Sequence, residues 1–279
     1  MKTVLTIAGS DCSGGAGIQA DLKTIGAYGL YGMSVITAVT SQNTQGVRGV
    51  WPVPAEVVRQ QLSAVFEDIF PDAVKIGMIA VEDNLYAVAD CLRKYRDLTG
   101  KRPFVVIDPV LVSTSGRPLL DSPAKKALTK TLFPLADLIT PNLPEACSLG
   151  STTILSGEEM SRRDREREAK NLSLRYGCSV LIKGGHGEGA SDDFLYNNRS
   201  GTGTWYCNER IENENTHGTG CTLSSAIACG MARGDSLEEA VGDAKEYITG
   251  AIRDGMDLGK GNGPLNHFYR LQSTEIFSN

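Results

Sequence analysis

Asn215-Thr216-His217-Gly218-Thr219-Gly220-Cys221-Thr222 is the stretch around which the rest of the chain is arranged, and small residues dominate the positions 223–230 that follow it. Its two glycines flank a threonine and lead into a segment that favours a helix, so several backbone N–H groups are expected at the positive end of that helix. Such an end binds anions, and phosphate in particular. Cys221 falls in the first turn, where the helix dipole is expected to lower the pKa of the thiol. The alternative is that the glycines only shape a turn and that Cys221 is a buried filler, so the rest of the chain has to decide.

The composition is that of an ordinary globular protein. The chain has 279 residues, of which 41% are hydrophobic and 22% charged, and this length allows one large α/β domain or two smaller ones. A net charge of −5 argues against a general nucleic-acid surface and against an anionic membrane partner. No apolar run approaches the roughly 20 residues that a membrane helix needs. Met1-Lys2-Thr3 leads directly into a strand-like run, so no signal peptide is expected.

The cysteines indicate a reducing compartment. The chain has seven, an odd number, and none of them forms a C-x-x-C pair. This pattern argues against a disulfide framework and against a structural zinc site. We therefore expect a cytoplasmic protein in which most cysteines are small core residues, with Cys221 as the exception.

Short apolar segments alternate with helical patterns along the whole chain. Strands are expected at 3–8, 33–40, 73–76, 104–107, 137–140 and 179–182. Helices are expected at 18–28, 54–70, 83–95, 123–132, from the turn at 218–221 onward, and from 236 to 254. Two further short strands, at 193–196 and 204–207, are expected to form a meander at the edge of the sheet. This order predicts an α/β fold, in which one doubly wound domain over residues 1–279 has a mostly parallel central sheet with helices on both faces.

Two segments stand outside this alternation. Residues 112–117 are rich in serine, threonine and glycine and are expected to form a mobile loop. The segment 149–171 is interpreted as a surface elaboration. Within it, Ser156 and Glu159 match a capping box that would open a heavily charged helix. The i,i+4 charge pairs of that helix indicate a solvated face rather than a binding patch.

Polar and functional residues gather at the carboxyl ends of the expected strands, whereas the strand interiors are apolar. In an open α/β sheet, ligands bind beyond those ends. The strand ends carry Asp11, Gln42-Asn43, Met78, Asp108, Asn142 with Glu145, and Lys183 with His186. This concentration predicts a small-molecule site along one edge of the sheet.

Two glycine motifs suggest nucleotide binding but lack their confirming context. Gly15-x-Gly17-x-x-Ala20 matches a relaxed dinucleotide fingerprint, yet no acidic residue between Asp21 and Glu56 is available to hold a ribose. The segment 183–187 resembles part of a phosphate loop without the full G-x-x-x-x-G-K-[ST] pattern. Lys183 could still neutralise a nucleotide phosphate as a point charge, or it could be a solvent-facing residue in a turn.

Oxygen donors at neighbouring strand ends suit a hard cation. Asp108, Asn142 and Glu145 are expected to hold Mg²⁺ partly through water and substrate phosphates. Asn142 and Glu145 lie beside prolines, however, so each also fits a cap or turn residue. The three histidines are too far apart in sequence for a local zinc motif. His217 is interpreted as shaping its turn, and no catalytic histidine is assigned.

Together with further short motifs, these residues form an ordered set from residue 3 to about 268. The motifs are Ile7-Ala8-Gly9-Ser10-Asp11, Ser13-Gly14-Gly15-Ala16-Gly17-Ile18-Gln19-Ala20-Asp21, Gln42-Asn43-Thr44, Lys75-Ile76-Gly77-Met78, Asp108-Pro109-Val110, Thr140-Pro141-Asn142, Lys183-Gly184-Gly185-His186, the stretch 216–222, and Gly263-Pro264-Leu265-Asn266-His267-Phe268. The set resembles the hydroxymethylpyrimidine/phosphomethylpyrimidine kinase family of thiamine biosynthesis, a branch of the ribokinase-like superfamily. Each motif alone is weak, whereas the ordered set is specific.

The resemblance implies a reaction and a role for each site residue. ATP would phosphorylate the hydroxymethyl group of 4-amino-5-hydroxymethyl-2-methylpyrimidine, and a second transfer to the monophosphate would yield the diphosphate. The pyrimidine would be bound by Gly9, Asp21, Gln42, Met78 and Val110. The catalytic anion hole would be formed by Gly218, Thr219, Gly220 and Cys221. The ATP phosphates would be bound by Asn142, Lys183 and Thr216, and the Mg²⁺ cofactor by Asp108 and Glu145.

The resemblance also implies a lid at 112–117 that excludes water, and a homodimer. Wider relatives place an aspartate base where this chain has Cys221. Two roles therefore stay open for the thiol, which is either the acceptor of the hydroxyl proton or a member of the anion hole.

Two other functions compete with this interpretation. A pyridoxal or pyridoxine kinase of the same superfamily would share the fold and the cysteine anion hole. The compared members carry a second cysteine in the lid, whereas this chain has Val112-Ser113-Thr114-Ser115-Gly116 there. A non-catalytic pyrimidine sensor is disfavoured, because Lys183, the glycines and Cys221 are all present and the chain has no added DNA-binding module.

Overall fold

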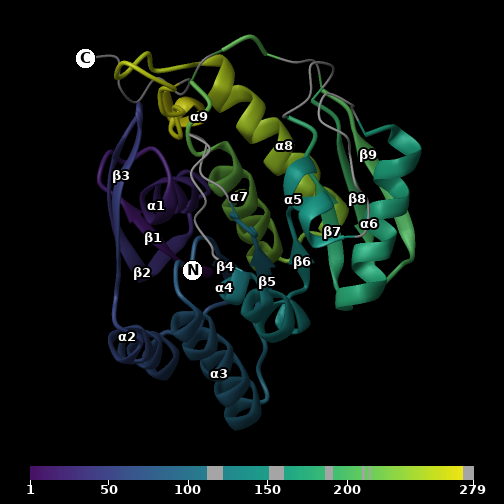
Figure 1. Ribbon diagram of the computed structural model, residues 1–279. Coiled ribbons are helices and arrows are strands. Elements are labelled where there is room, and N and C mark those ends of the chain that lie inside the picture. Colours follow the sequence, from purple (N-terminus) through teal and green to yellow (C-terminus); the bar gives the residue numbers. More distant parts are fainter. Residues whose placement is uncertain (112–121, 151–159, 186–190, 209–210, 214, 273–279) are drawn as a thin grey trace.

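A computed structural model describes residues 1–111, 122–150, 160–185, 191–208, 211–213 and 215–272 (Figure 1). Its apolar strands assemble into one nine-stranded sheet of order β3-β2-β1-β4-β5-β6-β7-β8-β9. The parallel strands are β1 (Thr3–Asp11), β2 (Tyr31–Asn43), β4 (Ala73–Ile76), β5 (Phe104–Ile107), β6 (Leu138–Ile139) and β7 (Ser179–Ile182). The antiparallel strands are β3 (Gly46–Pro52) at one edge and β8 (Asp193–Asn197) with β9 (Thr202–Tyr206) at the other. The predicted mostly parallel sheet and the edge meander are confirmed.

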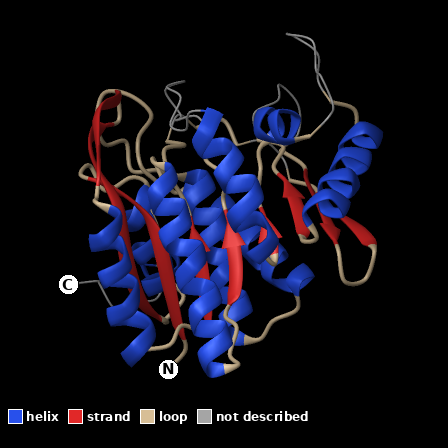
Figure 2. Ribbon diagram, turned by 60° about the horizontal axis from the view of Figure 1, so that its bottom comes forward, coloured by secondary structure: helices blue, strands red, loops and turns tan. Residues whose placement is uncertain are grey.

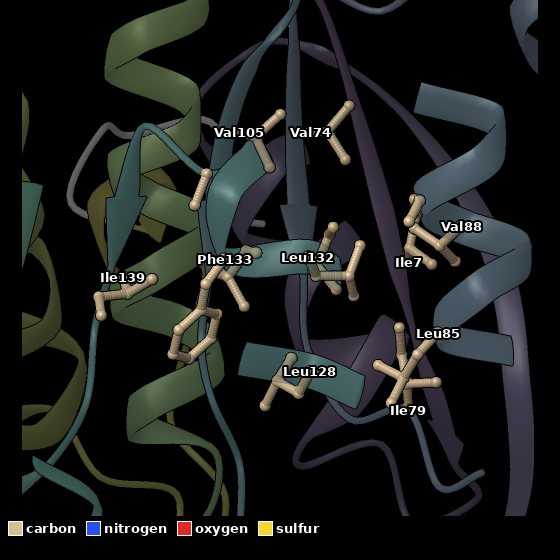
Figure 3. Close-up of a cluster of buried hydrophobic side chains, with 14 of the residues drawn as sticks. Ile7, Val74, Ile79, Leu85, Val88, Val105, Leu128, Leu132, Phe133 and Ile139 are labelled. Carbon is tan, nitrogen blue, oxygen red and sulfur yellow. The ribbon is translucent and has the colours of Figure 1, made fainter. Parts of the chain in front are cut away.

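Alternation along each strand divides the core into two layers. In β1, Leu5 and Ile7 pack into the larger cluster on one face of the sheet, whereas Val4 faces the other cluster. Figure 3 shows the larger layer, where Ile7 lies beside Val88, and Val74 and Val105 come from the neighbouring strands. Because both faces are covered, the strands read as nearly continuous apolar runs.

Helices cover both faces of the sheet (Figure 2). The larger cluster includes residues of α2 (Ala55–Asp68), α3 (Glu82–Thr99), α4 (Ser122–Ala127) with the π and 3₁₀ turns at 128–135, α5 (Leu143–Leu149) and α6 (Arg162–Tyr176). The smaller cluster includes residues of α1 (Gly17–Ala27), α7 (Thr219–Arg233) and α8 (Leu237–Arg253). A short helix α9 (Tyr269–Gln272) follows near the C-terminus. The layers therefore match the predicted doubly wound arrangement.

Small side chains allow α7 to lie deep in the molecule (Figure 1). Ala226, Ala228 and Cys229 are buried, and Gly230 packs so closely on α8 that a Cβ there would stand 2.8 Å from the Cβ of Ala240. A helix that is apolar on most sides must be enclosed by its neighbours. Because α7 is enclosed in this way, its N-terminus lies at the carboxyl edge of the sheet.

The structure corrects several predicted boundaries. The second strand runs on to Asn43 and pairs with β3, which was not predicted because glycines and valines alternate there without a clear apolar face. Helix α5 was also not predicted, since two prolines flank its start. Helix α6 begins at Arg162, and the Ser161 side chain caps it by accepting the N–H of Asp164.

Some predictions fall outside the described residues. These are the loop at 112–117, the proposed capping box at 156–159 with the part of the surface elaboration at 151–159, and His186. No helix in the described part of the chain combines the length and the hydropathy that crossing a bilayer requires.

Candidate active site

The loop after β1 is built around the buried carboxylate of Asp11. Its oxygens accept the backbone N–H groups of Ser13, Gly15 and Ala16 at 2.8–3.1 Å, and His217 Nε2 lies 3.0 Å from Oδ2. Burial by itself would raise the pKa of Asp11, but the hydrogen bonds from His217 and Ser13 outweigh burial and hold it well below its ordinary value. The carboxylate thus fixes this loop and ties it to the turn before α7.

The glycine turn before α7 leaves its N–H groups available. Gly218 adopts a left-handed φ of 87°, and a side chain there would collide with the carbonyl oxygen of Gly15. No side chain caps the helix, and the N–H groups of Gly220 and Cys221 have no acceptor among the described residues. The predicted anion-binding geometry is therefore present, since unpaired N–H groups at a helix N-terminus attract negative charge.

Two cavities meet at this turn. One has a volume of about 450 Å³ and lies between the β1–α1 loop, the ends of β2 and β4, and the segment 260–262. The other has a volume of about 730 Å³ and lies over the ends of β5, β6 and β7 and beside α8. Ala16 and Cys221 line both. A ligand in each cavity would meet the other ligand at the uncapped end of α7.

The smaller cavity collects most of the residues predicted to bind the pyrimidine. Gly9, Gln42, Met78 and Val110 line it. A Cβ at Gly9 would meet the end of the flexible Met78 side chain, which would have to move. The structure thus brings together polar and apolar groups suited to a small heteroaromatic ring.

Asp21 is the exception, and its predicted contact with the pyrimidine is not supported. Its side chain is 0% exposed and lies outside the lining of both cavities. The carboxylate instead binds Lys75, Thr6 and Ser225. The motif placed Asp21 near the site correctly, but one helical turn separates it from the loop, so its side chain points into the core between α1 and the sheet.

The larger cavity collects all residues predicted to bind phosphate or metal. Its lining includes Asn142, Lys183, Thr216, Asp108 and Glu145, together with the turn 218–221. Lys183 Nζ lies 2.7 Å from Asp108 Oδ1, which also accepts the Thr140 hydroxyl. Gly220 packs on this pair, because a Cβ there would stand 3.2 Å from Asp108 Oδ2 and 3.3 Å from Lys183 Nζ.

Asn142 and Glu145 form the capping box of α5. The Asn142 side chain accepts the N–H of Glu145 at 2.8 Å, and Glu145 Oε2 accepts the N–H of Asn142 at 2.9 Å. The sequence left open whether Asn142 and Glu145 are helix-capping residues, and the structure shows that both are. Burial raises the pKa of Glu145 to about 7; Lys183 opposes this rise and Asp108 adds to it.

The carboxylates of Asp108 and Glu145 suit a cation that takes most of its ligands from water and phosphate groups. Within the described ranges, no three His, Cys, Asp or Glu side chains come together as a metal cluster. Asp108 and Glu145 supply oxygen donors beside Lys183, and both Glu145 oxygens already accept backbone N–H groups. This donor set fits Mg²⁺ held through water and phosphates, and not an all-protein cage.

The expected lowering of the Cys221 pKa is wrong. Burial raises the pKa of the thiol, and the nearby positive charge of Lys75 lowers it only in part. Desolvation dominates, because a thiolate loses its hydration in this enclosed position. The backbone N–H of Gly17 also faces the sulfur. Cys221 is therefore suited to a hydrogen-bonding role in its protonated form.

Three features of the site escaped the sequence analysis. The segment 259–262 forms one wall of the smaller cavity by packing on Thr44, whose hydroxyl accepts the N–H groups of Lys260 and Gly261. Lys245 of α8 binds Asp193 at 2.7 Å in the larger cavity. The third is the bond between Asp11 and His217. Of these three features, only the first had a signal in the sequence, namely its glycines at 259 and 261. In the structure, a side chain at either position would collide with Thr44.

Known proteins match this architecture along the whole chain. Residues 11–266 match the phosphomethylpyrimidine kinase family. The chain belongs to that family. A hydroxymethylpyrimidine/phosphomethylpyrimidine kinase of Rhizobium meliloti is 48% identical over 95% of this chain and 97% of the relative. A thiamine biosynthesis bifunctional protein of Geobacter sulfurreducens is also 48% identical over 95% of this chain, which spans only 52% of that relative.

Solved structures of family members and their neighbours share the fold. A phosphomethylpyrimidine kinase of Clostridium difficile superposes with a TM-score of 0.77 at 43% identity, covering 90% of this chain and 100% of the other. A Bacillus subtilis pyridoxal kinase in complex with ADP superposes with a TM-score of 0.85 at 34% identity, covering 98% and 99%. The ribokinase-like fold predicted from the motifs is confirmed, and the phosphomethylpyrimidine kinase family is one of phosphotransferases.

Proposed function

We propose that this protein transfers the γ-phosphoryl group of ATP to the hydroxymethyl group of 4-amino-5-hydroxymethyl-2-methylpyrimidine, and then to the monophosphate, in thiamine biosynthesis. The observation that carries the proposal is the meeting of two cavities at the uncapped N-terminus of α7. One cavity has the size of a small ring and the other that of a nucleotide. The family membership supports the same reaction.

Catalysis follows from positioning and charge neutralisation. The hydroxymethyl oxygen attacks the γ-phosphorus while the bond to the β-phosphate oxygen breaks and ADP leaves, and the hydroxyl proton passes to an oxygen of the transferred phosphoryl group. Negative charge on the transferring group lies against the N–H groups of Gly220 and Cys221. Lys183, held by Asp108, faces the same turn. Cys221 acts as a protonated member of this anion hole, since burial raises its pKa and disfavours a thiolate base.

Mg²⁺ is the metal that the donor set fits. Asp108 and Glu145 would hold it together with the ATP phosphates, and the ion would screen the charge of the triphosphate. Asn142 has a capping bond to α5, so we assign it to the support of Glu145. Lys183 and Thr216 remain the proposed phosphate ligands.

The acceptor would bind in the smaller cavity. Gln42 would hydrogen-bond the polar edge of the ring, while Gly9, Met78 and Val110 pack around it. Lys260 is the one lysine or arginine among the described residues that line this cavity, so it is placed to bind the phosphate of the monophosphate in the second transfer. The homodimer, the lid at 112–117 and a cytoplasmic location remain predictions from the family resemblance.

A second candidate is phosphorylation of pyridoxal or pyridoxine. The TM-score of 0.85 to a pyridoxal kinase supports it, and the rings are similar in size. The absence of a cysteine from residues 112–116 favours the pyrimidine. A non-catalytic sensor has less support, because Lys183 and an open anion hole serve phosphate transfer and have no evident use in a binding protein.

The test is steady-state kinase activity with Mg-ATP on three acceptors: hydroxymethylpyrimidine, its monophosphate and pyridoxal. We expect the highest kcat/KM with the pyrimidine and measurable turnover of its monophosphate. A preference for pyridoxal would assign the protein to vitamin B6 salvage, and activity on none of the three would overturn the proposal.

Gln42→Ala sharpens this test. It removes a side-chain amide from the smaller cavity only, so we expect pyrimidine binding to weaken by about tenfold while ATP binding stays unchanged in calorimetry. An equal loss of both affinities would place the acceptor elsewhere.

A further inference from the structure

Below the catalytic turn lies a fully buried ion pair that the reaction does not use. Lys75 of β4 and Asp21 of α1 are both 0% exposed, and Lys75 Nζ lies 2.8 Å from each carboxylate oxygen. Burying two charges costs free energy, and replacing such a pair with apolar residues is often neutral or stabilising. The pair is therefore not explained by stability alone.

One carboxylate joins four elements of the fold. Asp21 lies on α1 and accepts Lys75 from β4, the Thr6 hydroxyl from β1 at 2.5 Å, and the Ser225 hydroxyl from α7 at 2.7 Å. Two residues after Lys75 stands Gly77, where a Cβ would lie 2.9 Å from Nζ. The lack of a side chain at Gly77 therefore leaves room for the Lys75 ammonium. Met78 follows directly and lines the acceptor cavity.

Ser225, which donates a hydrogen bond to Asp21, lies one helical turn after Cys221 on α7. With 3.6 residues per turn, residues four apart lie on the same side of a helix. Most other buried contacts of α7 are apolar and lack directional bonds. A second side-chain bond to another part of the chain joins Thr222 to His267. A hydrogen bond from Ser225 to a carboxylate held on three other elements therefore restrains both the rotation and the axial position of the first turn.

We propose that Asp21, held by Lys75, is a positioning residue for phosphoryl transfer, and that it anchors Ser225 so that the N–H groups at the start of α7 face the junction of the two cavities. The inference rests on the proposed kinase function and extends it. Misplacement of a reacting group by about 1 Å costs roughly a hundredfold in rate, so a modest shift of this turn would lower kcat. Substrate affinity should change little, because neither Asp21 nor Ser225 lines a cavity.

A matched pair of variants separates positioning from stability. Ser225→Ala and Thr6→Val each remove one hydroxyl bond to the same carboxylate from a side chain that is 0% exposed, but only Ser225 lies on α7. We expect Ser225→Ala to lower kcat about tenfold with both KM values within about twofold of wild type. Thr6→Val should leave kcat within about twofold, even where its loss of thermal stability equals that of Ser225→Ala.

Each outcome decides the proposal. Equal kcat losses in the two variants would show that the network supports only general stability, and unchanged kcat in Ser225→Ala would refute an anchoring role. If Ser225→Ala does not fold, Ser225→Cys provides a side chain of similar size with a weaker hydrogen-bond donor. We expect its kcat to be about threefold lower than that of Thr6→Val. A wild-type protein inactive on all three acceptors would instead overturn the proposed function.

Discussion

Helices α5 and α7 both begin at the larger cavity, and their N-termini are built in opposite ways. Helix α5 is closed by its own residues, because Asn142 and Glu145 satisfy one another's backbone N–H groups. Helix α7 begins at Thr219 after Gly218, and no side chain in the described part of the chain caps it. Both ends lie on the larger cavity, and both carry the positive end of a helix dipole. Only the end that is left open can offer its N–H groups to a ligand.

This difference explains why the turns have different compositions. A capping box needs side chains with oxygen acceptors close in sequence, so α5 is locally determined. An open end needs a backbone that can approach the ligand closely, so glycines lie at the start of α7. Hydrogen bonds to residues of other elements fix its position. His217 bonds Asp11, Thr222 bonds the buried His267 at 3.0 Å, and Ser225 bonds Asp21. An open anion site therefore depends on distant residues for its shape.

The largest expected effect comes from closing the α7 turn. In Gly218→Ala a side chain would collide with the Gly15 carbonyl at a left-handed φ, so the N–H groups must move. We expect kcat to fall by roughly a hundredfold. Gly234→Ala is the matched control, since Gly234 ends the same helix at a φ of 98° with open space around it. It should lose stability but keep its kcat. Similar kcat losses in both would show that backbone strain, and not the anion hole, accounts for the effect.

Cys221→Ala tests the side chain at the same end. Without the thiol we expect kcat to fall about tenfold and pyrimidine affinity to change far less. Cys221→Ser should retain most of the rate, because a hydroxyl also donates a hydrogen bond. Steady-state kinetics and calorimetry measure both quantities. Wild-type kcat in Cys221→Ala would remove the side chain from the chemistry and leave only its backbone N–H.

The pH dependence of stability tests the closed end. Burial raises the pKa of Glu145 from 4.5 to about 7, so between these values the folded protein holds a proton that the unfolded chain has released. The unfolded state then binds fewer protons, and the free energy of unfolding should fall as pH rises through this window, by about 3 kcal/mol. Glu145→Gln keeps an acceptor for the Asn142 N–H and should lack this decline. Urea titrations in EDTA at several pH values measure it, and identical slopes would contradict the raised pKa.

The smallest effect is expected from uncapping α5. Asn142→Ala removes the bond to the Glu145 N–H and should cost about 1 kcal/mol of unfolding free energy. Because we assign Asn142 to support, kcat should change by less than about threefold. Ser236→Ala, at the similar capping box of α8, is the control for a cap that lies away from the site. A large rise in the KM for ATP in Asn142→Ala alone would return Asn142 to the phosphate ligands.

Local features of the sequence predicted much of the site. Glycines at 218 and 220, and polar residues at 42, 108, 142 and 183, follow buried strands or open a helix, and strand ends at one edge of a parallel sheet must converge. The missed strand β3 and helix α5 had weak patterns, because glycines or prolines interrupt them. The same local patterns could not tell Asp21, which points into the core, from Asp11, which lies in the site.

The sequence by itself determined the fold class, the edge of the sheet that carries the two cavities and the glycine turn that opens α7, since these depend on hydrophobic periodicity and backbone freedom. Tertiary structure alone decided which charged groups are partners. Asp21 and Lys75 are 54 residues apart, and Asp11 and His217 are 206 apart. It also decided the protonation of Cys221, because desolvation depends on everything that surrounds the sulfur. Burial is a property of the whole fold, and no local pattern encodes it.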